Sequence, residues 1–119
     1  MTAILIAVLL AGAPVQTQAD VNQQALADWA RADAAMNAQY RATMAAMERI
    51  DGDGPAPDNN PGFAATLRAS QRAWVTYRDT TCVVEGYGFR GGSAEPGERS
   101  LCEARLTRER TAWLKAQTR

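Results

Sequence analysis

The sequence predicts an all-α fold: a small three-helix bundle with one disulfide and a Gly-rich loop between the second and third helices. Apolar side chains recur at steps of three, four and seven residues in three separate stretches. Segments rich in glycine and proline separate these stretches, and no part of the chain alternates as a half-buried strand would over a convincing length. The chain has 119 residues, which leaves room for one domain.

The first helix is expected to run from about Asn22 to Ile50. Alanine fills many of its positions, and alanine is the residue that costs least in a helix. Asp33 interrupts the apolar stripe, so it lies either at the edge of the stripe or inside the bundle, where it would need an arginine. The stripe itself consists of Leu26, Trp29, Met36, Tyr40, Met44 and Met47.

The second helix is expected to begin after residues 51–60, whose glycines and prolines stop the first helix. Asn60 is suited to be its N-cap, and Pro61 to occupy its first helical position. The helix should run to about Val84 or Glu85, with Gly86 ending it. One face of this helix carries Phe63, Leu67, Ser70 or Gln71, Trp74, Tyr77 or Arg78, and Thr81.

The stretch 86–93 contains too much glycine for regular structure and is expected to be a loop. The residues Ser100–Glu103 fit a capping box that either opens the third helix or lies just inside it. The aligned face of this helix carries Cys102, Leu106, Glu109 or Arg110, and Trp113.

The first nineteen residues are predicted to be a signal peptide that is cleaved after Ala19, which leaves a mature domain of residues 20–119. Residues 3–13 are all apolar or small, but as a helix they rise only about 16 Å, too short to span a bilayer. A retained N-terminal anchor is the alternative, because Met1 and Thr2 place no lysine or arginine before the apolar run. We therefore expect a periplasmic or secreted protein without a stable membrane span.

The two cysteines, Cys82 and Cys102, are most simply a disulfide if the protein is exported. Such a bond would close a loop of about twenty residues and help a domain too small for a large core. A metal pair or a reactive thiol is the weaker alternative, since the chain contains no histidine to complete a zinc site.

The charges balance overall, with thirteen basic and thirteen acidic residues, so we expect neither a nucleic-acid nor a membrane-surface partner. They are unevenly distributed, however. Residues 20–60 carry seven acidic residues and three arginines, whereas residues 61–119 carry ten basic and six acidic residues. This division would help the two halves dock on each other, or it would present one end to a charged partner.

The composition argues against an enzyme and against a bound cofactor or metal. Without histidine, the chain lacks the commonest general base, and no triad, metal set or phosphate loop can be assembled. The acidic loop containing Asp51, Asp53 and Asp58 does not fit an EF-hand. That pattern requires an oxygen ligand, a glycine and a glutamate where Pro55, Ala56 and Gly62 stand.

Two groups of residues could serve as contact surfaces. Tyr87, Phe89 and Arg90 in the Gly-rich loop have the side chains that dominate binding hot spots, although the two aromatics could instead fold back as a lid on the core.

Gln71, Trp74 and Arg78 form a ridge on the second helix. It is either a groove for a ligand or, as the periodicity favours, part of the core with Arg78 paired to an acid such as Asp33.

The run from Gln71 to Asp79, followed by Cys82, resembles the LprI-like lysozyme inhibitor N-terminal domain family. Gly91–Ser93, Cys102 and the run Leu106–Arg110 extend the likeness, as do features of the first helix, so it covers nearly all of the mature chain. The residues that carry the family motif are Asp33, Asn37, Tyr40, Gln71, Trp74, Tyr77, Arg78, Asp79 and Arg110.

The resemblance implies an exported, helical, disulfide-linked bacterial domain that binds a protein, with a lysozyme-type muramidase as the leading partner. Many members carry further cysteines in or before the first helix, and this chain has none. Inhibition would be steric: a rigid loop or helix edge would occlude the substrate cleft of the enzyme.

Lysozymes are commonly basic, so Asp51, Asp53 and Asp58 would steer the approach while Tyr87, Phe89 and Arg90 form the contact. The alternative function is an envelope structural or stress-related module with an endogenous periplasmic partner and no effect on lysozyme.

Overall fold

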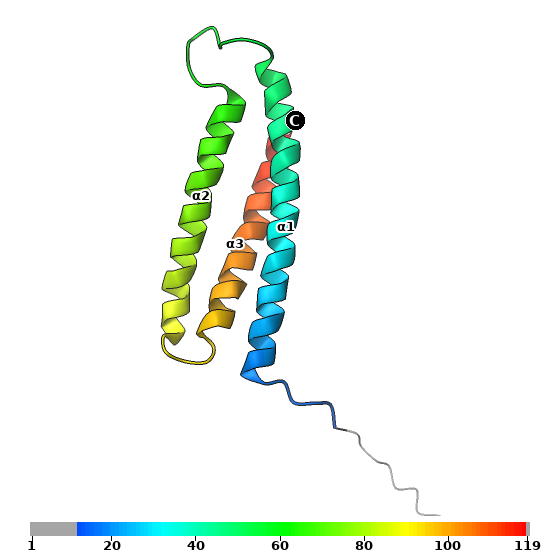
Figure 1. The fold of residues 1–119 in the computed structure, drawn as a ribbon, viewed down its shortest axis with the longest axis vertical. Coiled ribbons are helices and arrows are strands. Elements are labelled where there is room, and N and C mark those ends of the chain that lie inside the picture. Colours follow the sequence, from blue (N-terminus) through cyan, green and yellow to red (C-terminus); the bar gives the residue numbers. More distant parts are fainter. Residues whose placement is uncertain (1–11, 119) are drawn as a thin grey trace, which may run out of the picture.

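Three helices form one elongated bundle in a computed structural model of the chain, which describes residues 12–118. The helices are α1 (Gln18–Asp51), α2 (Phe63–Gly86) and α3 (Glu95–Gln117), and a short 3-10 turn, η1 (Tyr87–Phe89), follows α2. Successive helices run in opposite directions, and α3 packs mainly along α1 (Figure 1). The predicted all-α, three-helix fold is confirmed.

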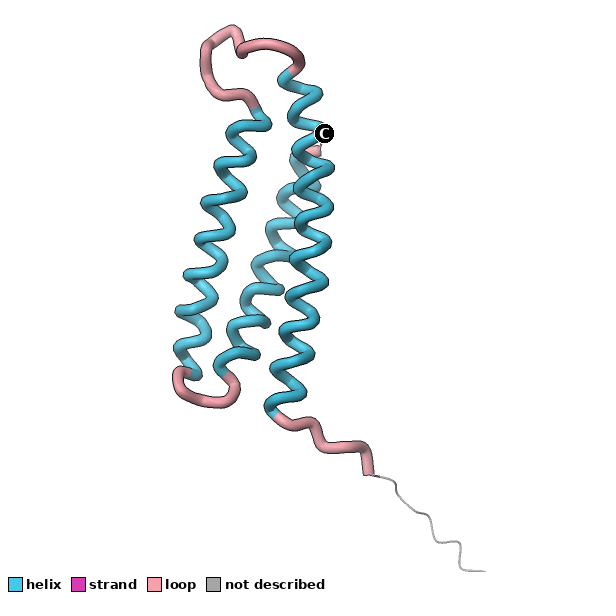
Figure 2. The backbone as a smooth tube through the Cα atoms, in the orientation of Figure 1, coloured by secondary structure: helices cyan, strands magenta, loops and turns pink. Residues whose placement is uncertain are grey.

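The loops that join the helices lie at opposite ends of the bundle (Figure 2). The α1–α2 loop is at the end where α1 and α3 terminate, and the Gly-rich α2–α3 loop is at the end where α1 begins. The 24 residues of α2 separate the two loops by about 36 Å, at a rise of 1.5 Å per residue.

The first helix begins at Gln18, earlier than the expected Asn22. Thr17 and Asp20 form a capping box: the Thr17 hydroxyl oxygen accepts from the Asp20 N–H, and the Asp20 carboxylate accepts from the Thr17 N–H, both at 3.1 Å. These reciprocal bonds satisfy donors that the first helical turn leaves free. The predicted cleavage site lies inside this first turn, whereas residues 1–11 of the predicted leader lie outside the described residues.

The second helix begins at Phe63, so the expected cap at Asn60 and Pro61 is wrong. Gly62 occupies the N-cap position and has no side chain with which to cap. Asp51, the last residue of α1, caps the helix instead: its carboxylate accepts from the N–H groups of Phe63 at 2.8 Å and Ala64 at 2.9 Å. A Cβ at position 62 would approach Asp51 Oδ2 to 2.7 Å, so glycine leaves the space that this carboxylate needs.

Replacing Asp51 with alanine should lower the free energy of unfolding by about 1 kcal/mol, because two N–H groups at the start of α2 lose their acceptor. Thermal unfolding followed by circular dichroism would measure the loss. Asp53→Ala is the matched control, since Asp53 is exposed in the same loop and should stay within about 0.5 kcal/mol of the parent. Equal stabilities of the two variants would contradict the assignment of this cap.

The Gly-rich segment is more ordered than the sequence suggested. The second helix continues through Gly86, and the 3-10 turn follows it directly. The third helix begins at Glu95 with Pro96 in its first turn, a position that proline tolerates. Ser100 is buried inside the helix, so Ser100–Glu103 lies just inside α3 and does not open it. The predicted capping box is wrong, because Ala94 occupies the N-cap position and the Glu103 carboxylate accepts from Arg99 Nε at 3.1 Å.

The hydrophobic core consists of two clusters that meet at Trp74. The first lies toward the α1–α2 loop, and Tyr40 packs against its edge; its buried members are Met36, Met44, Met47, Ala64, Leu67 and Leu114. The second surrounds the disulfide and contains Cys82, Cys102 and Leu106. Trp74 thus belongs to the core, as the periodicity favoured.

Three members of the predicted apolar stripes are exposed instead: Leu26 at 45%, Phe63 at 59% and Trp113 at 43%. Of the alternatives Tyr77 and Arg78, Arg78 is the buried one. Small residues and long polar side chains occupy the buried positions next to the exposed residues. On α1 these are Ala25 and Ala32, and on α2 and α3 they include Gln71, Arg78 and Arg110. Because α1 and α3 approach closely along small residues, a bulky side chain is displaced to the outer edge.

The uneven charge distribution serves helix docking. Asp28 on α1 contacts Arg108 on α3 at 2.9 Å, and Asp33 on α1 contacts Arg78 on α2 at 3.0 Å. Each pair joins an acid of the first half to an arginine of the second half.

Candidate functional site

Two acids of the sequence motif, Asp33 and Asp79, bond to Arg78, which is buried between the three helices. Its Nη1 donates to Asp33 Oδ1 of α1 at 3.0 Å and to Thr107 Oγ1 of α3 at 3.3 Å. Its Nε donates to Asp79 Oδ1 at 3.0 Å. The predicted pairing with Asp33 is confirmed. Thr107 is an addition that the sequence did not indicate, because nothing in the spacing along α3 marks it as the partner of an α2 residue.

A second buried arginine, Arg110 on α3, bonds to two neutral side chains of α2. Arg110 donates from Nε to Gln71 Oε1 at 3.0 Å and from Nη2 to Ser70 Oγ at 2.9 Å. Burial lowers the pKa of Arg110 from its ordinary value, but a guanidinium stays protonated in proteins.

Arginines and tryptophans alternate in a row that runs from the interior of the bundle to the partly exposed Trp113. The Arg78 guanidinium lies 5.7 Å from the Trp29 ring centroid and 5.3 Å from that of Trp74. Arg110 lies 5.6 Å from the Trp74 centroid and 4.2 Å from that of Trp113. These distances permit cation–π attraction, so the stack Trp29, Arg78, Trp74, Arg110, Trp113 ties together all three helices. We refer to it as the arginine–tryptophan stack.

The arginine–tryptophan stack is an internal brace. Its guanidinium groups bond to side chains of the chain itself, and Gln71 and Arg78 are buried, so the alternative of an open ligand groove on this ridge is wrong.

The other motif residues lie around this brace. Asn37 donates to Asp33 at 3.3 Å, Tyr40 is half-buried beside the core, and Tyr77 projects from the outer face of α2.

The predicted contact residues Tyr87, Phe89 and Arg90 lie together at the end of the bundle next to the disulfide. Cys82 and Cys102 are bonded there, with their Cα atoms 5.5 Å apart, which confirms the predicted disulfide. Tyr87 is 49% exposed and Phe89 46% exposed, and neither belongs to a core cluster, so the lid alternative does not describe them. We call Tyr87–Arg90 the tip.

Local bonds fix the conformation of the tip. The Arg90 N–H donates to the Tyr87 carbonyl at 3.2 Å, and the Arg90 guanidinium lies 4.6 Å from the Tyr87 ring centroid. The following loop is also anchored: the Gly91 N–H donates to the Glu95 carboxylate at 2.9 Å, and the Asn22 side chain donates to the Ser93 carbonyl at 2.8 Å.

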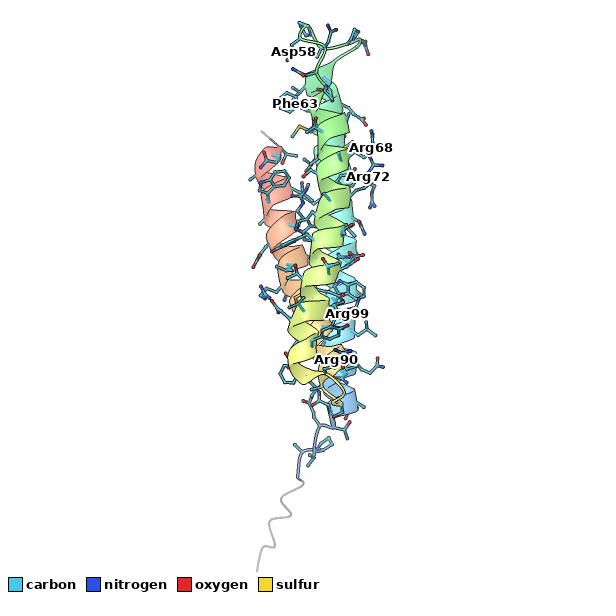
Figure 3. All side chains as sticks on the ribbon, turned by 90° about the vertical axis from the view of Figure 1, so that its left-hand side faces the viewer. Asp58, Phe63, Arg68, Arg72, Arg90 and Arg99 are labelled. Carbon is cyan, nitrogen blue, oxygen red and sulfur yellow. A yellow bond between two sulfur atoms is a disulfide. The ribbon has the colours of Figure 1, made fainter. Side chains whose placement is uncertain are left out.

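The acidic residues Asp51, Asp53 and Asp58 lie at the opposite end of the bundle (Figure 3 labels Asp58 there and Arg90 at the tip). The structure therefore does not bring the two predicted contact sets together. Asp51 is used as the α2 cap, and Asp58 accepts from the Asn60 side chain at 2.7 Å. Among residues 12–118, no three acidic or cysteine side chains gather in a way that could hold a metal ion.

The same end carries a feature that the sequence did not reveal, an apolar groove of about 700 Å³ between the α1–α2 loop and the helix ends. Ile50, Phe63 and Trp113 are among its lining residues. Each was visible in the sequence only as a member or neighbour of a helical stripe. Their convergence depends on how the three helices pack.

Within the described part of the chain, none of the helices has both the length and the apolar character needed to cross a membrane.

Comparison with known proteins assigns the family. The model of the family described as lysozyme inhibitor LprI matches residues 11–114. An uncharacterized protein of Rhizobium meliloti (strain 1021) is 44% identical over 100 residues, which cover 83% of this chain and 72% of that protein. No solved structure matches. The chain, whose motif residues build the buried brace around Arg78, belongs to the LprI lysozyme inhibitor family.

Proposed function

We propose that this protein is exported and inhibits a lysozyme-type muramidase by inserting its tip into the substrate cleft of the enzyme. The observation that carries the proposal is the tip itself: two half-exposed aromatic rings and an arginine at one end of a slender bundle, directly next to the disulfide. Family membership supplies the class of partner. Steric occlusion requires no catalytic group from the inhibitor.

The rigidity of the tip favours tight binding. Association costs free energy for every loop and side chain that must be ordered, and the hydrogen bonds of Arg90 and Gly91 hold the loop in one conformation beforehand. Tyrosine and arginine are also enriched among the residues that contribute most to binding. A small, stiff projection of this kind suits a concave target.

Export agrees with the disulfide, because such bonds persist in oxidising compartments. We extend the proposal to the leader: residues 1–19 direct export and are cleaved, which leaves residues 20–119 as the mature domain.

The tip makes the contact alone in this proposal. The acidic loop lies about 36 Å from the tip along α2, whereas charges in physiological salt are largely screened beyond about 8 Å. Asp53 and Asp58 are therefore too far away to steer an enzyme onto the tip.

Replacing Tyr87, Phe89 and Arg90 together with alanine should weaken inhibition about tenfold or more, because each truncation removes a contact of hot-spot type. The assay is the lysis of a bacterial cell-wall suspension by several lysozymes, titrated with oxidised inhibitor.

A matched control is the double variant Tyr77→Ala/Arg72→Ala, which removes an exposed tyrosine and an exposed arginine from the flank of α2. Figure 3 shows Arg72 on α2, away from Arg90. The control should inhibit like the parent, and circular dichroism should show both variants folded. If the parent protein leaves lysis unchanged at large molar excess, or if the tip variant inhibits as well as the parent, the proposal fails.

A further inference from the structure

The groove at the end opposite the tip is built from all three helices. Ile50 comes from the end of α1, Phe63 from the start of α2 and Trp113 from the last turns of α3. The α1–α2 loop forms the remaining wall, and the groove has a volume of about 700 Å³. This volume falls within the range of sites that hold a ligand or a few side chains of a partner.

Three large apolar side chains remain exposed around this one concavity. Ile50 is 53% exposed, Phe63 59% and Trp113 43%. Single exposed apolar residues are ordinary on a protein surface, whereas a group that lines one hollow is typical of a docking site.

The charged residues that line the groove favour a positively charged ligand. Within residues 12–118, the charged residues that line it are Asp51 and Asp58, and no lysine or arginine of this part of the chain does so. Asp51 is occupied as the α2 cap, and hydrogen bonds from the Asn60 side-chain amide, and secondarily from its backbone N–H, lower the pKa of Asp58. Asp58 is therefore ionised at neutral pH and faces solvent at the rim.

The helix termini reinforce this preference. Both α1 and α3 end beside the groove, and the carbonyl groups at a helix C-terminus favour a cation. The opposing positive end of α2 is already matched by the Asp51 carboxylate. Arg49 and Lys115 lie in the last turns of α1 and α3 but do not line the groove.

We propose that this groove docks a short segment of a second protein partner in which an apolar or aromatic side chain stands beside a lysine or arginine. The apolar side chain fills the space among Ile50, Phe63 and Trp113, and the cation pairs with Asp58. Because the groove and the tip are at opposite ends of the bundle, both can be occupied at once, so the protein can hold this partner while its tip blocks an enzyme.

The test uses a blocked peptide, acetyl-Ala-Arg-Leu-Phe-Arg-Ala-amide, and a matched peptide with glutamine in place of both arginines. Each is titrated to about 1 mM into the ¹⁵N-labelled protein, and the amide and indole signals are followed by NMR. We expect the arginine peptide to shift the Trp113 indole and Phe63 backbone signals saturably. The glutamine peptide should bind several-fold more weakly, as should the arginine peptide in high salt.

Asp58→Asn should weaken the arginine peptide several-fold, because it removes the charge while retaining a similar side-chain shape. Asp53→Asn is the matched control: this residue is in the same loop but does not line the groove, so the dissociation constant should stay unchanged. Equal binding of the arginine and glutamine peptides, or no saturable shift at the groove, would overturn the proposal. Groove signals that shift with protein concentration alone would assign the groove to a second copy of the chain and would also overturn it.

Adding unlabelled lysozyme separates this inference from the proposed function. If lysozyme binds without displacing the peptide, both proposals stand. If lysozyme displaces the peptide and Asp58→Asn relieves inhibition, the groove itself holds the enzyme, which overturns both contact through the tip and the docking of a second partner in the groove.

Discussion

Arg78→Met should lower the free energy of unfolding by about 3 kcal/mol, the largest effect we expect from a single substitution in this chain. Arg78 is buried, and its guanidinium bonds to Asp33, Asp79 and Thr107. Methionine retains much of the apolar stem but removes these bonds together with the attraction to Trp29 and Trp74.

The exposure of the partners sets the size of this effect. Removing one member of a fully buried ion pair costs about 3–5 kcal/mol, mainly because the other charge is left unpaired in a dry environment. The side chains of Asp33 and Asp79 are 35% and 44% exposed, so water can partly solvate them after the substitution. We therefore expect a value at the lower end of that range.

Urea unfolding followed by circular dichroism measures the change, with the midpoint and the slope fitted separately. Arg72→Met is the control, because Arg72 is exposed on the same helix and its replacement should change stability by no more than about 0.5 kcal/mol. Similar losses in both variants would show that Arg78 does not brace the bundle as described.

Removing the disulfide with the double variant Cys82→Ala/Cys102→Ala should also lower the free energy of unfolding by about 3 kcal/mol. The cysteines are 20 positions apart, and on the chain-entropy model a crosslink over a loop of this length restricts the unfolded chain by about that amount. Alanine avoids placing two hydroxyl groups in the core, since both cysteines are almost completely buried.

Unfolding of the parent in the presence of a reducing agent provides an independent comparison. Reduction and the double substitution should give similar losses, with the substitution costing slightly more because it also removes two buried sulfur atoms. A parent protein whose stability is unchanged by verified reduction of the bond would contradict the expected role of the crosslink.

The tip should respond to the same change. The disulfide holds the end of α2 against the start of α3. Without it the intervening loop is freer in the unbound protein, so more conformational entropy is lost on binding and inhibition should weaken.

The sequence predicted several long-range contacts as well as the helices. The spacing of the cysteines and the expectation of export indicated the disulfide. A charged residue inside each of two apolar stripes indicated the pairing of Asp33 with Arg78, because a buried charge requires a partner. These two contacts could be predicted because the chain has only two cysteines and few charged residues inside its apolar stripes.

The rotation of each helix about its own axis, which decides the face that it buries, was harder to predict from the sequence. Neighbouring residues on a helix differ in direction by about 100°, so a periodic stripe leaves two adjacent candidates at its edge. The sequence offered Ser70 or Gln71 and Tyr77 or Arg78, and the packing against α1 and α3 buried Gln71 and Arg78. Interactions between helices made this choice, and no local signal in α2 encodes it.

The sequence by itself determined the number of helices, the breaks between them, the crosslink and the family motif. Periodicity and helix-breaking residues act locally along the chain, and the two cysteines can form only one intramolecular pair. Only the tertiary structure decided that Asp51 caps α2, that the tip and the acidic loop lie at opposite ends, and that Ile50, Phe63 and Trp113 surround one groove. These features depend on the relative placement of helix ends that are distant in the chain. That placement follows from how whole helix faces pack, which no single segment specifies.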